Sequence, residues 1–223
     1  MAKTFSTILA LDTAMSGCSA CVFDAQSGQA FVRSEDMPRG QAQHLIPMVE
    51  DVMGQAGCGY EALEAIVTTN GPGAFTGLRI GLSSAKAFAQ ALAIPVFGIT
   101  TLQALALAYA PDAGGEFCVL VETRREEFYA QRFGADGAAL EDARLARAEE
   151  IAPDGVVFIG DGAARFKGLN AAAETIEGFE LPDPEVMARS LATNPALFSE
   201  NPAALYLRGA DVSASKRSQR RIA

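Results

Sequence analysis

The sequence is poor in the residues that many catalytic and metal sites use. Its 223 residues include one histidine, His44, and no tryptophan. A single imidazole excludes a paired-histidine metal site, and a serine–histidine hydrolase would have to use His44 itself. Four cysteines are too few for a disulfide framework. The close pair, Cys18 and Cys21, would point to opposite faces of a strand, so we interpret the cysteines as small buried hydrophobic residues and expect no metal site.

A long hydrophobic run is also missing near the N-terminus. The apolar stretch TILAL stops at Asp12, which makes it too short for the core of a signal peptide or for a membrane span. We therefore expect a cytoplasmic protein that makes no membrane contact.

Positive charge is scarce outside the C-terminus. The chain has 18 basic and 27 acidic residues, and the last eleven residues, SASKRSQRRIA, contain four of the basic ones and no acid. The rest of the chain keeps 14 basic against 27 acidic residues, a charge near −13, which repels phosphate backbones. We expect residues 209–223 to form a basic, disordered tail. Contact of this tail with RNA held by a partner is the alternative, which deletion of the tail would test.

The pattern of apolar residues predicts an α/β protein with two related lobes. Three strands at the start are followed by alternating helices and strands, the order βββαβαβα of a ribonuclease H-like lobe. The pattern restarts near residue 117, and ILALDT (8–13) matches CVLVET (118–123) as an apolar run ending in an acid and Thr. We expect an actin/Hsp70-like (ASKHA) fold with a first lobe at 1–110 and a reduced second lobe at 111–208.

The second lobe contains the weaker signals. We expect its third strand near 138–140 and a helix around Ala146. Arg124 and Arg125 fall in a turn between two predicted strands, where we expect them to face solvent.

The stretch TTNGPGAFTGLRIGLSSAKAFAQAL (68–92) is a glycine-rich turn followed by a helix. Its glycines are spaced GxGxxxG and no GK[ST] follows, so neither the dinucleotide fingerprint nor the P-loop fits. Beside the apolar stripe of the helix, Gly77, Gly81 and Ser84 form a row of very small residues. This row predicts close packing, either against the protein's own first helix or against a second chain.

Two catalytic classes remain as alternatives. A small actin-fold ATPase or kinase would use Asp12 and Thr13 at its first phosphate turn, with Gly71 beside them as a vestigial nucleotide site. Asp12 could equally cap a strand end without any ligand. The GDGA turn at 160–163 lacks a longer glycine-rich adenosine loop, which argues against turnover. A peptidase or other hydrolase, the second class, would depend on His44.

Several segments resemble the TsaB family, also called YeaZ. The resemblance is carried by ILALDTAMSGCSACVFD, HLIPMVEDVM, TTNGPGAFTGLRIGLSSAKAFAQALAIPVFGITTLQALA, VETRREEFY and ALYLR, in which GPGxFTGLRIG is a specific motif. It implies a non-catalytic partner of TsaD, the related subunit that transfers the threonylcarbamoyl group from threonylcarbamoyl-adenylate to an adenosine beside the tRNA anticodon. TsaE is the accompanying ATPase. The resemblance implies no cofactor of the chain's own beyond weak nucleotide binding, and contact with tRNA only through the complex.

The resemblance places the partner contact on the first two helices. TsaD carries a paired-histidine metal motif, whereas this sequence has His44 followed four residues later by Met48, which suits a non-catalytic role. We expect the same surface to form a homodimer when TsaD is absent, and Gly81→Leu to weaken both assemblies. Arg79 could instead pair with an acid of its own chain. The residues expected at the contact are His44, Met48, Gly73, Phe75, Gly77, Arg79, Gly81 and Ser84.

Overall fold

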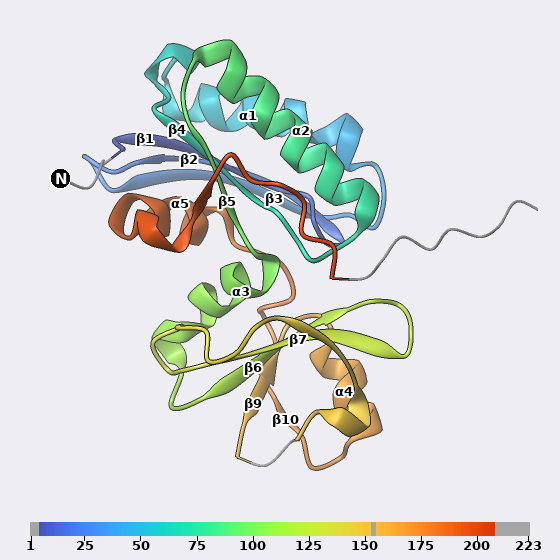
Figure 1. Cartoon of the computed structure of the whole chain (residues 1–223). Helices are drawn as coiled ribbons and strands as arrows, with labels where there is room; N and C mark the ends of the chain where they lie inside the picture. Colours follow the sequence, from blue (N-terminus) through green and yellow to red (C-terminus); the bar gives the residue numbers. More distant parts are fainter. Residues whose placement is uncertain (1–4, 153–154, 208–223) are drawn as a thin grey trace, which may run out of the picture.

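The computed structural model describes residues 5–152 and 155–207, which form two lobes, each built on one mixed β-sheet (Figure 1). The expected basic tail, 209–223, lies outside the described residues.

The first sheet has the strand order β11-β5-β4-β1-β2-β3. The central strand β1 pairs antiparallel with β2 and parallel with β4. Strands β1 and β4 are apolar along most of their length because helices cover both faces of this sheet. The strands are β1 (Thr7–Asp12), β2 (Gly17–Asp24), β3 (Gln29–Asp36), β4 (Ala65–Thr69), β5 (Val96–Ile99) and β11 (Ser199–Glu200).

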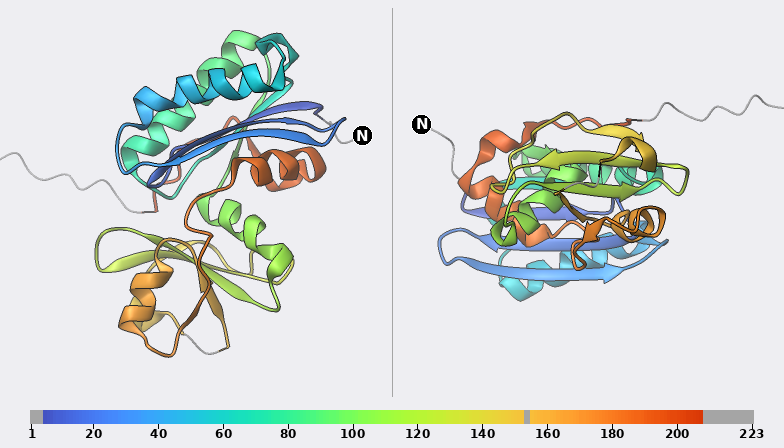
Figure 2. Two further views of the ribbon diagram at one scale, coloured as in Figure 1. Left: turned by 180° about the vertical axis from the view of Figure 1, so that it is seen from behind. Right: turned by 90° about the horizontal axis from the view of Figure 1, so that it is seen from below.

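Two pairs of helices cover the first sheet. The pair α1 (Gln41–Ala56) and α2 (Phe75–Leu92) lies on one face, where Leu45 and Ile66 belong to the same buried cluster. The pair α3 (Thr101–Tyr109) and α5 (Pro184–Thr193) lies on the face turned toward the second lobe (Figure 2). Helix α3 also packs on the second sheet, so it joins the two lobes.

The second sheet repeats the first. Its order is β10-β9-β6-β7-β8, so each strand occupies the place of the strand five numbers earlier in the first sheet, with the same parallel and antiparallel pairings. This repetition confirms the predicted two-lobed actin-like fold. The elements are β6 (Phe117–Glu122), β7 (Glu127–Phe133), β8 (Arg144–Arg147), β9 (Val157–Ile159), α4 (Ala163–Leu169) and β10 (Glu174–Thr175). Short 3₁₀ turns lie at Tyr60–Ala62, Ala110–Asp112, Ala148–Glu150 and Pro195–Leu197.

The second half departs from the prediction in two places. The helix expected around Ala146 is wrong, because this alanine is buried in strand β8, which pairs with β7. The strand expected near 138–140 amounts to one isolated bridge at Ala139.

The chain also returns to the first lobe before residue 208. Helix α5 buries Met187, Ala188 and Leu191 in the cluster that contains Ile8, and β11 pairs with β5. The apolar stripe of α5 thus covers part of the sheet face that is turned toward the second lobe. The second lobe therefore ends before this helix.

Candidate functional site

The glycine-rich loop and the start of α2 cover the turn that follows β1. A Cβ atom on Gly77 would lie 2.0 Å from the carbonyl oxygen of Thr13, and one on Gly81 would lie 2.8 Å from the Thr13 hydroxyl. That hydroxyl donates a hydrogen bond of 2.7 Å to the Gly77 carbonyl. The small residues of α2 therefore serve the close approach of the helix to its own chain.

Asp12 is buried at the end of β1, with 2% of its surface exposed. Its carboxylate accepts hydrogen bonds from the Thr69 hydroxyl and from the Ala14 N–H, the latter at 3.2 Å. Burial raises the pKa of Asp12 to about 6, against the opposing effect of these hydrogen bonds. Asp12 thus caps a strand end inside the protein.

Gly71, the third residue predicted for a nucleotide site, is shaped by the C-terminal segment. Its φ of 110° is a backbone conformation that favours glycine, and a Cβ here would lie 2.6 Å from the Leu205 carbonyl oxygen. Asp12, Thr13 and Gly71 are all buried, and none of them lines the cavity between the lobes.

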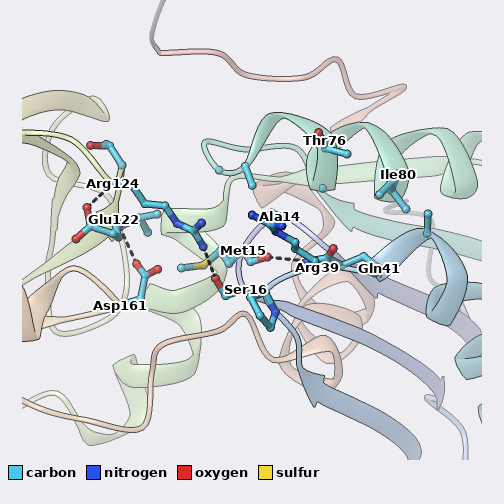
Figure 3. A pocket seen from close by; sticks show the side chains of 18 of the residues that line it. Ala14, Met15, Ser16, Arg39, Gln41, Thr76, Ile80, Glu122, Arg124 and Asp161 are labelled. Carbon is cyan, nitrogen blue, oxygen red and sulfur yellow. Dashed lines mark hydrogen bonds between the residues drawn. The ribbon is translucent and has the colours of Figure 1, made fainter.

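A cavity of about 560 Å³ lies between the lobes (Figure 3). Arg39, from the loop before α1, and Arg124, from the turn between β6 and β7, both line it. The N-terminal end of α2 also opens there, without a side-chain cap or an acid in its first turn. The lining residues include Ala14, Met15, Ser16, Gln41, Gly73, Thr76, Gly77, Ile80, Glu122, Thr123, Tyr129 and Asp161.

Arg124 and Arg125 are exposed, as the sequence predicted, but Arg124 also makes a contact with the first lobe. Its guanidinium donates a hydrogen bond of 3.3 Å to the Ser16 hydroxyl across the cavity. Its backbone has a φ of 58°, and its N–H donates to Glu122 Oε1 at 2.6 Å. The turn therefore carries one polar link between the two lobes.

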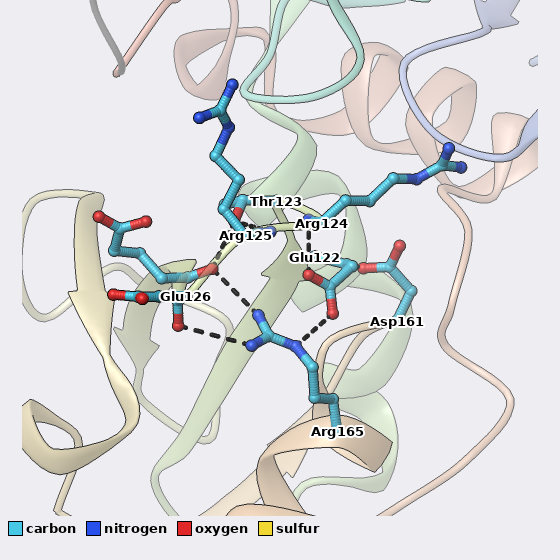
Figure 4. A network of polar contacts seen from close by, with 8 residues as sticks. Glu122, Thr123, Arg124, Arg125, Glu126, Asp161 and Arg165 are labelled. Atoms are coloured by element: carbon cyan, nitrogen blue, oxygen red, sulfur yellow. Dashed lines mark hydrogen bonds and ion pairs between the residues drawn. The ribbon is translucent and has the colours of Figure 1, made fainter.

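A polar network supports this turn from below (Figure 4). Glu122 Oε2 accepts a hydrogen bond of 2.6 Å from Arg165, whose guanidinium also lies 3.7 Å from the centre of the Phe128 ring. Asp161 accepts the Glu122 N–H at 2.8 Å, and burial raises the pKa of Asp161 to about 6. The network places two acids at the ends of neighbouring parallel strands, β6 and β9.

The residues predicted to contact a partner do not form one patch. Met48, Gly77 and Gly81 are buried, so they contact the interior of their own chain and are not available to a partner. His44 is exposed and lies 4.0 Å from Glu35 on the outer strand β3. Because α1 covers β2 and β3 whereas α2 covers β4, His44 lies on the side of α1 away from α2.

Two of the exposed members, Phe75 and Arg79, lie together in the first turns of α2, with Gly73 just before the helix and Ser84 farther along it. Phe75 is 52% exposed, Arg79 is exposed, and Gly73 and Ser84 are partly exposed. The Arg79 guanidinium lies 3.9 Å from the centre of the Phe75 ring.

Sequence reasoning missed Arg39, Arg124 and Tyr206. Tyr206 packs on Phe75 with ring centres 5.4 Å apart, and only the family resemblance of ALYLR marked its segment. No local signal could place the two arginines, because their directions depend on how the lobes meet.

Within 5–152 and 155–207, no group of three His, Cys, Asp or Glu side chains is arranged to hold a metal ion. In the same ranges, no helix combines the length and the apolar character needed to cross a membrane.

Comparisons with known proteins agree with this architecture. The family model described as "TsaD: tRNA N6-adenosine threonylcarbamoyltransferase" matches residues 33–218. A relative from Escherichia coli, the tRNA threonylcarbamoyladenosine biosynthesis protein TsaB, is 31% identical over 58% of this chain and 55% of its own length. The chain thus spans about half the length of the curated relatives it matches.

Two solved structures from Pseudomonas aeruginosa cover much more of the fold. One, described as an uncharacterized protein with similarity to peptidase YEAZ, has a TM-score of 0.78 and 27% identity, covering 91% of this chain and 100% of its own. The other, YeaZ, has a TM-score of 0.76 and 26% identity with the same coverage. The chain therefore belongs to the family that the threonylcarbamoyltransferase model describes, and its relatives place it in the TsaB (YeaZ) branch.

Proposed function

We propose that the chain is a non-catalytic partner subunit in the biosynthesis of threonylcarbamoyladenosine on tRNA. In this proposal it binds TsaD, which transfers the threonylcarbamoyl group from threonylcarbamoyl-adenylate to the anticodon-adjacent adenosine, and works together with the ATPase TsaE. It meets tRNA only through the complex and needs no cofactor of its own.

One observation carries this proposal: helix α2 packs directly on the turn after β1. Gly77 and Gly81 bring the helix onto Thr13, and Asp12 is used up in hydrogen bonds within the chain. In this packing the residues that an actin-fold ATPase would turn toward its ligand hold a helix in place instead. The one histidine of the sequence cannot supply the paired-histidine metal motif expected of TsaD.

The surface proposed for the partner is the exposed side of α1 and α2. Ile46 of α1 is 40% exposed and Phe75 of α2 is 52% exposed, and large apolar side chains on neighbouring helices favour association. The same surface would form a homodimer when TsaD is absent. A stable contact of this kind buries roughly 1,600 Å² in total.

Matched variants of two equally exposed residues test the surface. Phe75 and Leu140 are each 52% exposed, but Leu140 lies in the second lobe. We expect Phe75→Glu to weaken TsaD binding and self-association at least about tenfold in sedimentation experiments, because a charge would be buried at the interface. Leu140→Glu should leave both unchanged. Equal binding by the two variants would place the interface elsewhere.

Gly81→Leu is no longer a suitable test. A larger side chain at this position would collide with Thr13 inside the chain, so the variant would report on folding.

Residual nucleotide binding in the cavity between the lobes is a second candidate function. Arg39, Arg124 and the uncapped end of α2 together favour a phosphate group there. This proposal moves the vestigial site away from Asp12, Thr13 and Gly71. A peptidase-like role finds less support, because the described polar neighbour of His44 is Glu35 at 4.0 Å and no serine hydroxyl within 5–152 and 155–207 pairs with it.

A further inference from the structure

The segment 201–206, which we call the strap, crosses the glycine-rich loop and ends beside the start of α2. The Asn201 N–H donates a hydrogen bond of 2.9 Å to the Val96 carbonyl, which extends the edge of the first sheet beyond β11. Farther along, the Leu205 N–H donates to the Asn70 carbonyl at 2.7 Å. The backbone of the strap is therefore held at both ends.

Two glycines make room for the strap. A Cβ on Gly98 would lie 2.3 Å from Pro202, and one on Gly71 would lie 2.6 Å from the Leu205 carbonyl oxygen. Any other residue at these two positions would push the strap away from the sheet and from the loop. Part of the glycine content of the loop thus serves the C-terminal segment.

Tyr206, at the end of the strap, meets Phe75 and Arg79 of α2. The Tyr206 and Phe75 rings are 5.4 Å apart, and Arg79 Nε donates to the Tyr206 hydroxyl at 3.4 Å. The Arg79 guanidinium lies over the Phe75 ring, at 3.9 Å from its centre. Each of the three side chains limits the rotamers of the other two, although Tyr206 and Phe75 remain 44% and 52% exposed.

Arg79 has no carboxylate within ion-pair distance among the described residues. The Arg79 guanidinium contacts the Phe75 ring face and the Tyr206 hydroxyl. Both contacts leave room for a carboxylate from another protein to approach the guanidinium.

We propose that Tyr206 is a positioning residue for partner binding: it holds Phe75 and Arg79 in the arrangement in which they meet the partner subunit. The matching surface is a protein surface with an apolar pocket for the Phe75 ring and a carboxylate for Arg79. This inference rests on the proposed function, and it adds the strap to a surface that the sequence placed on two helices alone.

Full-length variants test the inference. We expect Tyr206→Ala to raise the Kd for TsaD about tenfold and Tyr206→Phe about threefold or less, because the phenylalanine keeps the ring contact and loses the hydroxyl. Leu140→Ala, the exposed control in the second lobe, should leave the Kd unchanged. Calorimetric titration with purified TsaD gives the values, and thermal unfolding shows whether each variant is folded.

A double-mutant cycle separates positioning from a direct or a purely structural role. If Tyr206 acts through Phe75 and Arg79, Tyr206→Ala should cost less in a Phe75→Ala background than in the unaltered chain, and no more than about twofold when Arg79→Ala is added to that background. Independent effects that multiply in the double variant would overturn the inference, as would an unchanged Kd for Tyr206→Ala. Failure of the unaltered chain to bind TsaD at all would instead contradict the proposed function.

Discussion

Strands β1 and β6 hold equivalent places in the two lobes and end in the same way. Each ends in an acid followed by threonine, and each acid accepts the N–H two residues on: Asp12 from Ala14 at 3.2 Å, Glu122 from Arg124 at 2.6 Å. The threonine hydroxyls both donate to backbone carbonyls. The turns differ in what lies over them, because α2 buries the first and the second borders the cavity between the lobes.

The segment that follows the neighbouring parallel strand, β4 or β9, decides this difference. Gly77 and Gly81 bring α2 against the first turn, so that Asp12 loses contact with solvent. In the second lobe, Gly160 and Gly162 fit against the backbone of Leu120, two residues before the acid, and leave Glu122 and Arg124 at the cavity. A duplicated turn can therefore either be buried under a helix or line a polar cavity, according to where the small residues after the neighbouring parallel strand fall.

The largest effect should come from filling the space beneath α2. A Cβ on Gly77 would lie 2.0 Å from a backbone oxygen, whereas Gly54 of α1 has nothing within 4 Å. We expect Gly77→Ala to lower the free energy of unfolding by about 3 kcal/mol, because the helix must move. The matched Gly54→Ala should raise it by about 0.5–1 kcal/mol through helix propensity. Urea unfolding measures both values, and equal stability of the two variants would mean that α2 does not press on the first turn.

The next effect is a pH dependence of the free energy of unfolding, which should differ between Asp12 and Asp161. A raised pKa means that the folded state holds the proton more tightly than the unfolded chain, so stability is highest below pH 3.8 and falls as the pH rises through about 6. For Asp12 this loss amounts to about 3 kcal/mol, an upper value for such a shift. Asp12→Asn should remove it and flatten the profile of unfolding free energy between pH 4 and 7.

Asp161→Asn is the counterpart in the second lobe. Its pKa is also raised to about 6, but its position at the cavity gives solvent screening, so the flattening should be smaller. A larger change for Asp161→Asn would reverse the comparison.

The Asp12 variant also tests the ATPase alternative. ATP hydrolysis by the isolated chain that disappears in Asp12→Asn would support an ATPase function.

The smallest effect should come from Arg124, which makes one of the polar links between the lobes. Its φ of 58° suits asparagine, and the exposed hydrogen bond to Ser16 contributes little, so Arg124→Asn should change the free energy of unfolding by less than about 0.5 kcal/mol. Arg124→Val should cost about 1–2 kcal/mol, because a β-branched residue is strained at this φ. Equal values for the two variants in urea unfolding would contradict the assigned turn.

Most of the first lobe could be predicted from the sequence because each of its apolar stripes covers the neighbouring strands. The destination of α5 could not, since the stripe of Met187 and Leu191 would suit the open face of either sheet. The candidate site shows the same limit. The spacing of Gly77 and Gly81 predicted that α2 closely approaches another segment, but not that this segment is the turn at Thr13. The positions of Arg124 and Tyr206 depend on contacts with residues more than a hundred positions away.

Reconstitution of adenosine modification with purified TsaD and TsaE tests the central claim most directly. We expect threonylcarbamoyl transfer to tRNA when this chain is added, little transfer without it, and none from this chain alone. Phe75→Glu should lower the rate at limiting concentration and recover it at high concentration, as expected for a defect in binding. Transfer by the isolated chain, or full activity of TsaD and TsaE in its absence, would contradict the account.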